Sequence, residues 1–113
     1  MTSAEIKWAD FEKVEMRVAT VLSAELNPKA RKPAYIFTLD FGESGIKTSS
    51  AQVTVLYNAG ELIGRQVLCV CNFAPKRVAG VKSEVLITGA ANADGDIVLA
   101  GFTLPVPNGH RLI

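Results

Sequence analysis

The sequence predicts an all-β domain that closes into a small barrel and carries one short helix. Three features point to this class: short segments of alternating or apolar character fill most of the chain, turn residues separate them, and one helical segment interrupts the series near its middle. A sandwich of strands usually lacks such a central helix, so the pattern favours a closed barrel.

Length and composition indicate one domain over residues 1–113. Chains of about 100 to 150 residues can bury a single core, and a second domain does not fit. Hydrophobic residues make up 49% of the chain and charged residues 20%, which excludes intrinsic disorder.

The first half of the chain contains three predicted strands. Residues 10–16 are expected to form one short helical turn, and a β-branched strand follows over 17–24. Residues 35–41 alternate strictly between large apolar and other side chains, which predicts a strand with one buried face. A turn at 42–45 leads to the third strand at 46–49.

One helix is predicted, at residues 51–57. Ser50 is the expected N-cap, because its hydroxyl can accept a free backbone N–H of the first turn. Gly60 and Gly64 bracket the exit from this region.

Three further strands are predicted in the second half, over 66–72, 83–88 and 96–100, the last after a turn at Asp94-Gly95. Five or more strands with one helix favour the OB-fold. This fold binds ligands on the face of its second and third strands and in neighbouring loops, so Lys47 and Lys76 fall where ligands are expected.

The net charge of +1 hides an uneven distribution. Residues 17–82 carry nine positive and four negative side chains, a balance of +5, whereas residues 1–16 and 83–113 each have a balance of −2. The basic middle can be a solvated face that serves solubility, or it can converge on an anionic partner.

The segment 46–52 concentrates polar groups at a predicted strand-to-helix junction. It supplies an ammonium, hydroxyls and an amide, and a helix N-terminus would add N–H donors for an anion. Simple helix capping is the alternative. A nucleotide P-loop is excluded because no glycine directly precedes the lysine. The candidate binding residues here are Lys47, Ser49, Ser50 and Gln52.

The segment 72–84 brings three cations to a strand connection. Arginine can grip a phosphate or carboxylate with two hydrogen bonds, and the lysines act as point charges. The alternative is an ordinary hydrophilic connection. The candidate binding residues here are Asn72, Lys76, Arg77, Lys82, Ser83 and Glu84.

No catalytic or metal site is expected. The single histidine, His110, lies near the chain end and has no nucleophile pattern around it. Cys69 and Cys71 are expected to be small core residues that share one face of a strand, without a disulfide or zinc. We therefore predict a protein that is not an enzyme and needs no cofactor.

The two candidate segments together resemble the tRNA-binding-domain family, which occurs as an appendage of methionyl-tRNA synthetases and of the phenylalanyl-tRNA synthetase β subunit. The resemblance rests on residues 46–52 and 72–86, with support from 10–13, 29–34 and 106–109, and covers nearly the whole chain. The residues Ser83-Glu84-Val85-Leu86 stand where synthetase domains tend to have Ser-Glu-Gly-Met, which favours the stand-alone, secretion-associated chaperones of the family.

The resemblance implies a five-stranded OB-fold barrel that forms a homodimer through segments at both chain ends and binds tRNA by its shape. For the stand-alone members it also implies binding of unfolded preproteins or peptides during export. It carries the binding role to the candidate residues named above; for Lys82 the charge argument alone does so.

Two functions from different classes are therefore expected: a tRNA-binding module, and a chaperone whose apolar grooves, flanked by Lys47 and Lys76, hold extended peptides. A purely tRNA-binding protein without chaperone activity is the alternative. The N-terminal residues lack the pattern of a secretory signal and no apolar run is long enough to span a membrane, so a cytoplasmic protein without membrane insertion is expected.

Overall fold

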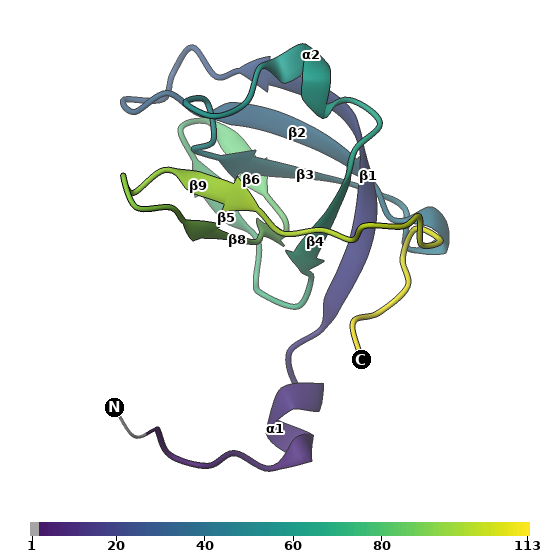
Figure 1. The fold of residues 1–113 in the computed structure, drawn as a ribbon. Helices are drawn as coiled ribbons and strands as arrows, with labels where there is room; N and C mark the ends of the chain where they lie inside the picture. Colours follow the sequence, from purple (N-terminus) through teal and green to yellow (C-terminus); the bar gives the residue numbers. More distant parts are fainter. Residues whose placement is uncertain (1–2) are drawn as a thin grey trace.

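A five-stranded antiparallel sheet curves into a nearly closed barrel (Figure 1). The structure is a computed structural model that describes residues 3–113. The strand order is β3-β2-β1-β4-β7, which confirms the predicted OB-fold class. The strands are β1 (Met16–Leu26), β2 (Tyr35–Asp40), β3 (Ile46–Ala51), β4 (Gln66–Val70) and β7 (Leu86–Ile87).

Strand β1 belongs to both sides of the barrel because it is long and bent. Its first half pairs with β4 and its second half with β2, and the register shifts between Val21 and Ser23. At this bulge the Val21 N–H donates to the Arg65 carbonyl at 2.9 Å, and the Gly64 N–H donates to the Val21 carbonyl at 2.8 Å. The bulge lets one strand turn the corner that closes the barrel.

The barrel interior is filled by the alternating face of β2. Phe37 and Leu39 are fully buried, and so is Phe41 just beyond the strand end, as the alternation predicts. Leu62, from the short helix α2 (Ala59–Leu62), is also fully buried and joins this core.

The predicted helix at residues 51–57 is wrong. Ala51 is the last residue of β3 and pairs with Tyr35, and the only α-helix that the described residues form between β3 and β4 is α2. Three β-branched side chains within 53–55 disfavour a helix there. The helix begins after Asn58 instead, whose N–H donates to the Glu61 carboxylate at 2.8 Å, one half of a capping box.

Two small hairpins replace what the sequence predicts as single strands or loops. The predicted strand 83–88 is divided between β6 (Val81–Ser83) and β7, and β6 pairs with β5 (Lys76–Val78). The predicted strand 96–100 is confirmed as β9 (Ile97–Leu99), which pairs with β8 (Gly89–Ala91).

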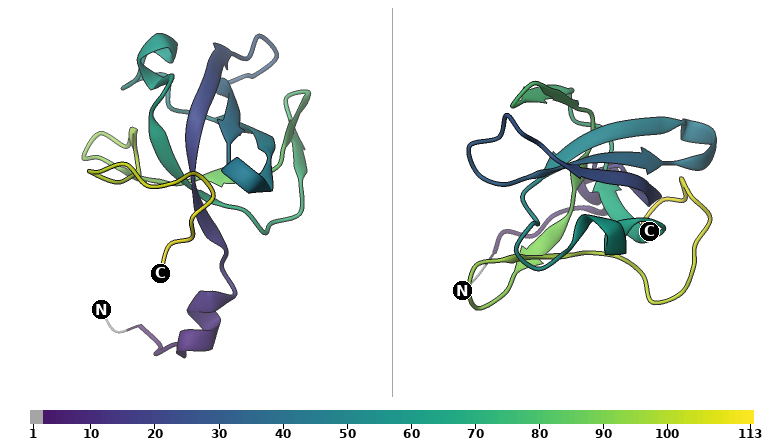
Figure 2. Two further views of the ribbon diagram at one scale, coloured as in Figure 1. Left: turned by 90° about the vertical axis from the view of Figure 1, so that its right-hand side faces the viewer. Right: turned by 90° about the horizontal axis from the view of Figure 1, so that it is seen from above.

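The described N-terminal segment and the C-terminal end lie on the same side of the barrel (Figures 1 and 2). Helix α1 (Trp8–Glu12) stands away from the barrel and begins before the predicted turn at 10–16. The C-terminal segment runs along β1, where the Val18 N–H donates to the His110 carbonyl at 3.0 Å. A 3₁₀ turn, η1 (Gly42–Ser44), joins β2 to β3, and no helix of the described residues is long and apolar enough to cross a membrane.

The C-terminal segment reaches the barrel by close backbone contact at Gly109. This residue has a φ of +88°, and a Cβ placed there would lie 2.3 Å from the Phe41 carbonyl oxygen. Gly95 has nearly the same φ, +86°, but a Cβ there would meet nothing within 4 Å. Alanine substitutions at the two glycines therefore distinguish backbone strain, which both positions share, from a steric clash, which only Gly109 has.

We expect Gly109→Ala to destabilise the fold by about 2 to 4 kcal/mol, because it adds a steric clash to the left-handed backbone penalty of about 1 to 2 kcal/mol. Gly95→Ala is the matched control and should lose only the backbone part. Urea unfolding of both variants measures the difference. Equal losses would mean that the close approach of residues 41 and 109 does not matter for stability.

Candidate nucleic-acid and peptide interface

The barrel closes where β3 meets residues 83–85, and these two stretches hold most of the predicted binding residues. The Glu84 N–H donates to the Thr48 carbonyl at 2.8 Å, and the Thr48 N–H donates to the Glu84 carboxylate at 3.1 Å. The side chain of Glu84 is thus occupied in joining two segments that are 36 residues apart in sequence.

Ser49 lies inside this closure rather than on the surface. Its side chain is 0% exposed, and its hydroxyl donates to the Val85 carbonyl at 2.7 Å. Beside it, the Ser50 N–H donates to the Ser83 hydroxyl at 3.3 Å. The contribution of Ser49 to any ligand is therefore indirect: it positions β3 against residues 83–85.

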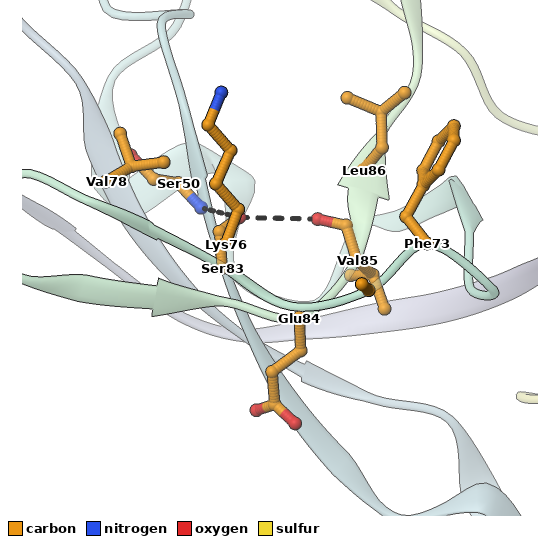
Figure 3. Close-up of a pocket in the computed structure, with 9 residues that line it drawn as sticks. Ser50, Phe73, Lys76, Val78, Ser83, Glu84, Val85 and Leu86 are labelled. Carbon is orange, nitrogen blue, oxygen red and sulfur yellow. Dashed lines mark hydrogen bonds between the residues drawn. The ribbon is translucent and has the colours of Figure 1, made fainter.

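A groove of about 510 Å³ opens next to the closure (Figure 3). Its lining is mainly apolar, with Phe73, Val78 and Leu86, of which Phe73 is 60% exposed. Lys76 rises on the same side as Phe73 and Leu86, whereas the Glu84 carboxylate points the opposite way. The groove combines an apolar surface with one cation and the polar groups of Ser50 and Ser83.

The β5–β6 hairpin has two faces of different character. Neighbouring residues of a strand point to opposite faces, so Lys76 and Val78 line the groove while Arg77 points away from it. Lys82 is the register partner of Arg77 and shares this outer face. The adjacent cations Lys76 and Arg77 therefore serve two different surfaces.

The loop between β1 and β2, residues 27–34, meets this hairpin. A hollow of about 350 Å³ is lined by Arg31 and Lys32 from the loop, by Val78 from the hairpin and by Gln52 after β3. Sequence reasoning did not include the cations of this loop in the binding set. The signal that could have identified these cations is their concentration in a loop between two neighbouring strands, because an OB-fold binds ligands in such loops.

Two predicted residues lie elsewhere. The Asn72 side chain donates to the Lys13 carbonyl at 2.6 Å and accepts from the Glu15 N–H at 3.0 Å, so it anchors the segment before β1. Lys47 is half-buried and, with Arg17, lies near Glu15. The hydrogen bond from Arg17, with a smaller effect of Lys47, lowers the pKa of Glu15 below its usual value.

The cysteines are free thiols of the core, as predicted. Cys69 is fully buried and Cys71 is partly buried against the same cluster. Burial raises the pKa of Cys69 to about 12, with a smaller contribution from Cys71, so this thiol stays protonated. Such thiols pack as small apolar groups.

A comparison with known families covers the barrel closure together with most of the chain. A family model described as "Putative tRNA binding domain" matches residues 16–111. The chain belongs to this tRNA-binding-domain family. The match includes every residue of the groove, the hairpin and the basic loop, as the sequence resemblance predicts.

Solved structures and curated relatives give two kinds of neighbour. The chaperone CsaA from Bacillus anthracis is 46% identical, with a TM-score of 0.91, and the match covers 97% of this chain and 100% of that one. The CsaA chaperone protein from Picrophilus torridus is 37% identical, with a TM-score of 0.88, covering 96% and 100%. The methionine–tRNA ligase of Flavobacterium johnsoniae is 33% identical over 92% of this chain, but this chain spans only 14% of that ligase. These similarities confirm the prediction of a CsaA-like protein of the tRNA-binding-domain family.

We expect Ser49→Ala to destabilise the fold by about 1 to 3 kcal/mol, because it leaves the buried Val85 carbonyl with only the long 3.5 Å hydrogen bond from the Ser83 hydroxyl. Ser50→Ala is the matched control, since the interaction of Ser50 with Ser83 uses its backbone N–H. Chemical denaturation followed by fluorescence measures both. A loss for Ser50→Ala as large as that for Ser49→Ala would contradict the structural role of the Ser49 hydroxyl.

Proposed function

We propose that the chain binds tRNA through the β5–β6 hairpin and the β1–β2 loop, and that it acts as a homodimeric, CsaA-like chaperone for export. The observation that best supports the tRNA site is that cations from two separate elements, the hairpin and the loop, come together. The salt bridges of residues 3–113 are Lys13 with Asp10 and Arg17 with Glu15, so the cations of the hairpin and the loop have no carboxylate partner among the described residues.

Recognition by backbone and shape fits these groups best. Arg77 and Lys82 are exposed and lie opposite each other, an arrangement of like charges that costs stability unless an anion lies between or above them. Phe73 is the exposed aromatic residue nearest to Arg77 in sequence, and its ring faces the groove rather than this outer face. Phosphate contacts without base stacking are the expected mode.

The chaperone function is proposed for the groove. Extended segments of unfolded preproteins expose apolar side chains, for which Phe73, Val78 and Leu86 offer a matching surface. The similarity to CsaA chaperone structures supports this choice. A purely tRNA-binding protein is the second candidate function, and substitutions of the groove residues Phe73 and Leu86 distinguish the two.

Dimerisation through both chain ends is part of the proposal. Trp8 in α1 is 68% exposed, and Leu104 and Ile113 in the C-terminal region are exposed as well. A twofold arrangement would cover these apolar side chains and double the basic surface offered to one tRNA. Both proposed partners, tRNA and preproteins before export, are met in the cytoplasm, where we place the protein.

We expect the double variant Arg77→Ala with Lys82→Ala to weaken tRNA binding and to flatten its salt dependence. The wild type should show a log–log slope on the order of −3 per subunit, and the loss of two phosphate contacts should make it less steep by about 2. A mobility-shift titration over a range of salt concentrations measures this. Lys13→Ala, an exposed cation paired with Asp10, is the control. A wild-type slope near zero would contradict tRNA binding by these cations.

We expect Phe73→Ser with Leu86→Ser to impair suppression of aggregation of an unfolded export preprotein, while tRNA affinity stays within about twofold of wild type. The reason is that both side chains line the groove and neither belongs to the basic outer face. Light scattering of the aggregating preprotein provides the measurement. If the wild type itself fails to suppress aggregation, the purely tRNA-binding alternative holds.

A further inference from the structure

Lys29 and Arg77 come from different elements, and both side chains approach Gly80 at the tip of the β5–β6 hairpin. A Cβ placed at Gly80 would lie 3.1 Å from the Cδ and 3.5 Å from the Nζ of Lys29. The guanidinium of Arg77 donates to the carbonyl of the same Gly80 at 3.2 Å. The missing side chain of Gly80 therefore makes room for the Lys29 side chain at the same residue whose carbonyl binds Arg77.

The buried side chain of Asn27 fixes this arrangement. Asn27 is only 7% exposed, and its amide donates to the Ala79 carbonyl at 3.2 Å across 52 residues of sequence. Its side-chain oxygen accepts from the Lys29 N–H at 3.0 Å. One side chain thus holds the hairpin turn with one end and the backbone of Lys29 with the other.

The hairpin tip has an unfavourable backbone conformation and an unfavourable charge arrangement in the absence of an anion. Ala79 has a φ of +46°, a left-handed conformation that is rare for alanine, and Gly80 follows at +83°. Lys29 and Arg77 bring like charges to this turn, without a carboxylate within salt-bridge distance among residues 3–113. An anion at the tip would relieve the repulsion, and the phosphates of an RNA backbone carry the required charge.

We propose that Asn27 is a positioning residue of the tRNA site, which holds Lys29 against the hairpin tip so that Lys29 and Arg77 both contact the RNA backbone. This inference rests on the proposed tRNA function and extends it to two residues of the β1–β2 loop. Asn27 itself does not contact the RNA; it acts through Lys29.

A double-mutant cycle on the full chain tests the proposal. The affinity for tRNA is measured over a range of salt concentrations for the wild type, Asn27→Ala, Lys29→Ala and the double variant. We expect Lys29→Ala to weaken binding about threefold to tenfold and to make the salt slope less steep by about 1. Asn27→Ala should weaken binding to a similar extent, and the double variant should bind no more weakly than Lys29→Ala alone.

Independent, multiplying losses in the double variant, or wild-type affinity of Asn27→Ala, would overturn the positioning role. Thermal unfolding confirms that each variant is folded at the temperature of the assay. If Asn27→Ala does not fold, Lys29→Ala alone decides, because an unchanged salt slope would remove Lys29 from the site. Lys13→Ala is again the control cation. Failure of the wild type to bind tRNA would instead contradict the proposed function itself.

Discussion

The contact between β3 and residues 83–85 determines where the groove and the β5–β6 hairpin lie. Thr48 and Glu84 exchange two hydrogen bonds there, and the buried hydroxyl of Ser49 adds a third to Val85. A short barrel strand has no other partner along this edge, so the polar groups must satisfy one another. The β5–β6 hairpin leaves the barrel directly before this contact. Its position, and the groove beneath it, follow from the closure.

The β5–β6 hairpin in turn places residues that are adjacent in sequence on two surfaces of different chemical character. Lys76 and Val78 face an apolar groove, whereas Arg77 and Lys82 face outward. A small domain can therefore offer one surface to phosphates and another to apolar chain segments without a second domain. Six of the nine cations of residues 17–82 lie in two elements: Lys29, Arg31 and Lys32 in the β1–β2 loop, and Lys76, Arg77 and Lys82 in the hairpin.

Much of the fold could be predicted from the sequence because its signals are local. The alternation of β2 directly reflects burial, and the family motifs lie at the barrel closure. The predicted helix lies too early in the sequence because Ser50 is also a residue type that caps helices, whereas the capping pair of α2 is Asn58 and Glu61. The turn of the β5–β6 hairpin has alanine, Ala79, at a left-handed position where asparagine or glycine is usual, so the sequence does not reveal this turn. The link from Asn27 to Ala79 spans 52 residues, and no local pattern reports such a contact.

Amide chemical-shift mapping of the labelled protein, titrated separately with tRNA and with an apolar preprotein peptide, tests the separation of the two surfaces most directly. tRNA should shift the resonances of the outer hairpin face and the basic loop, at Lys29, Arg77 and Lys82. The peptide should shift those of the groove, at Phe73 and Leu86. Shifts of the same residues by both ligands, with direct competition between them, would contradict two distinct surfaces.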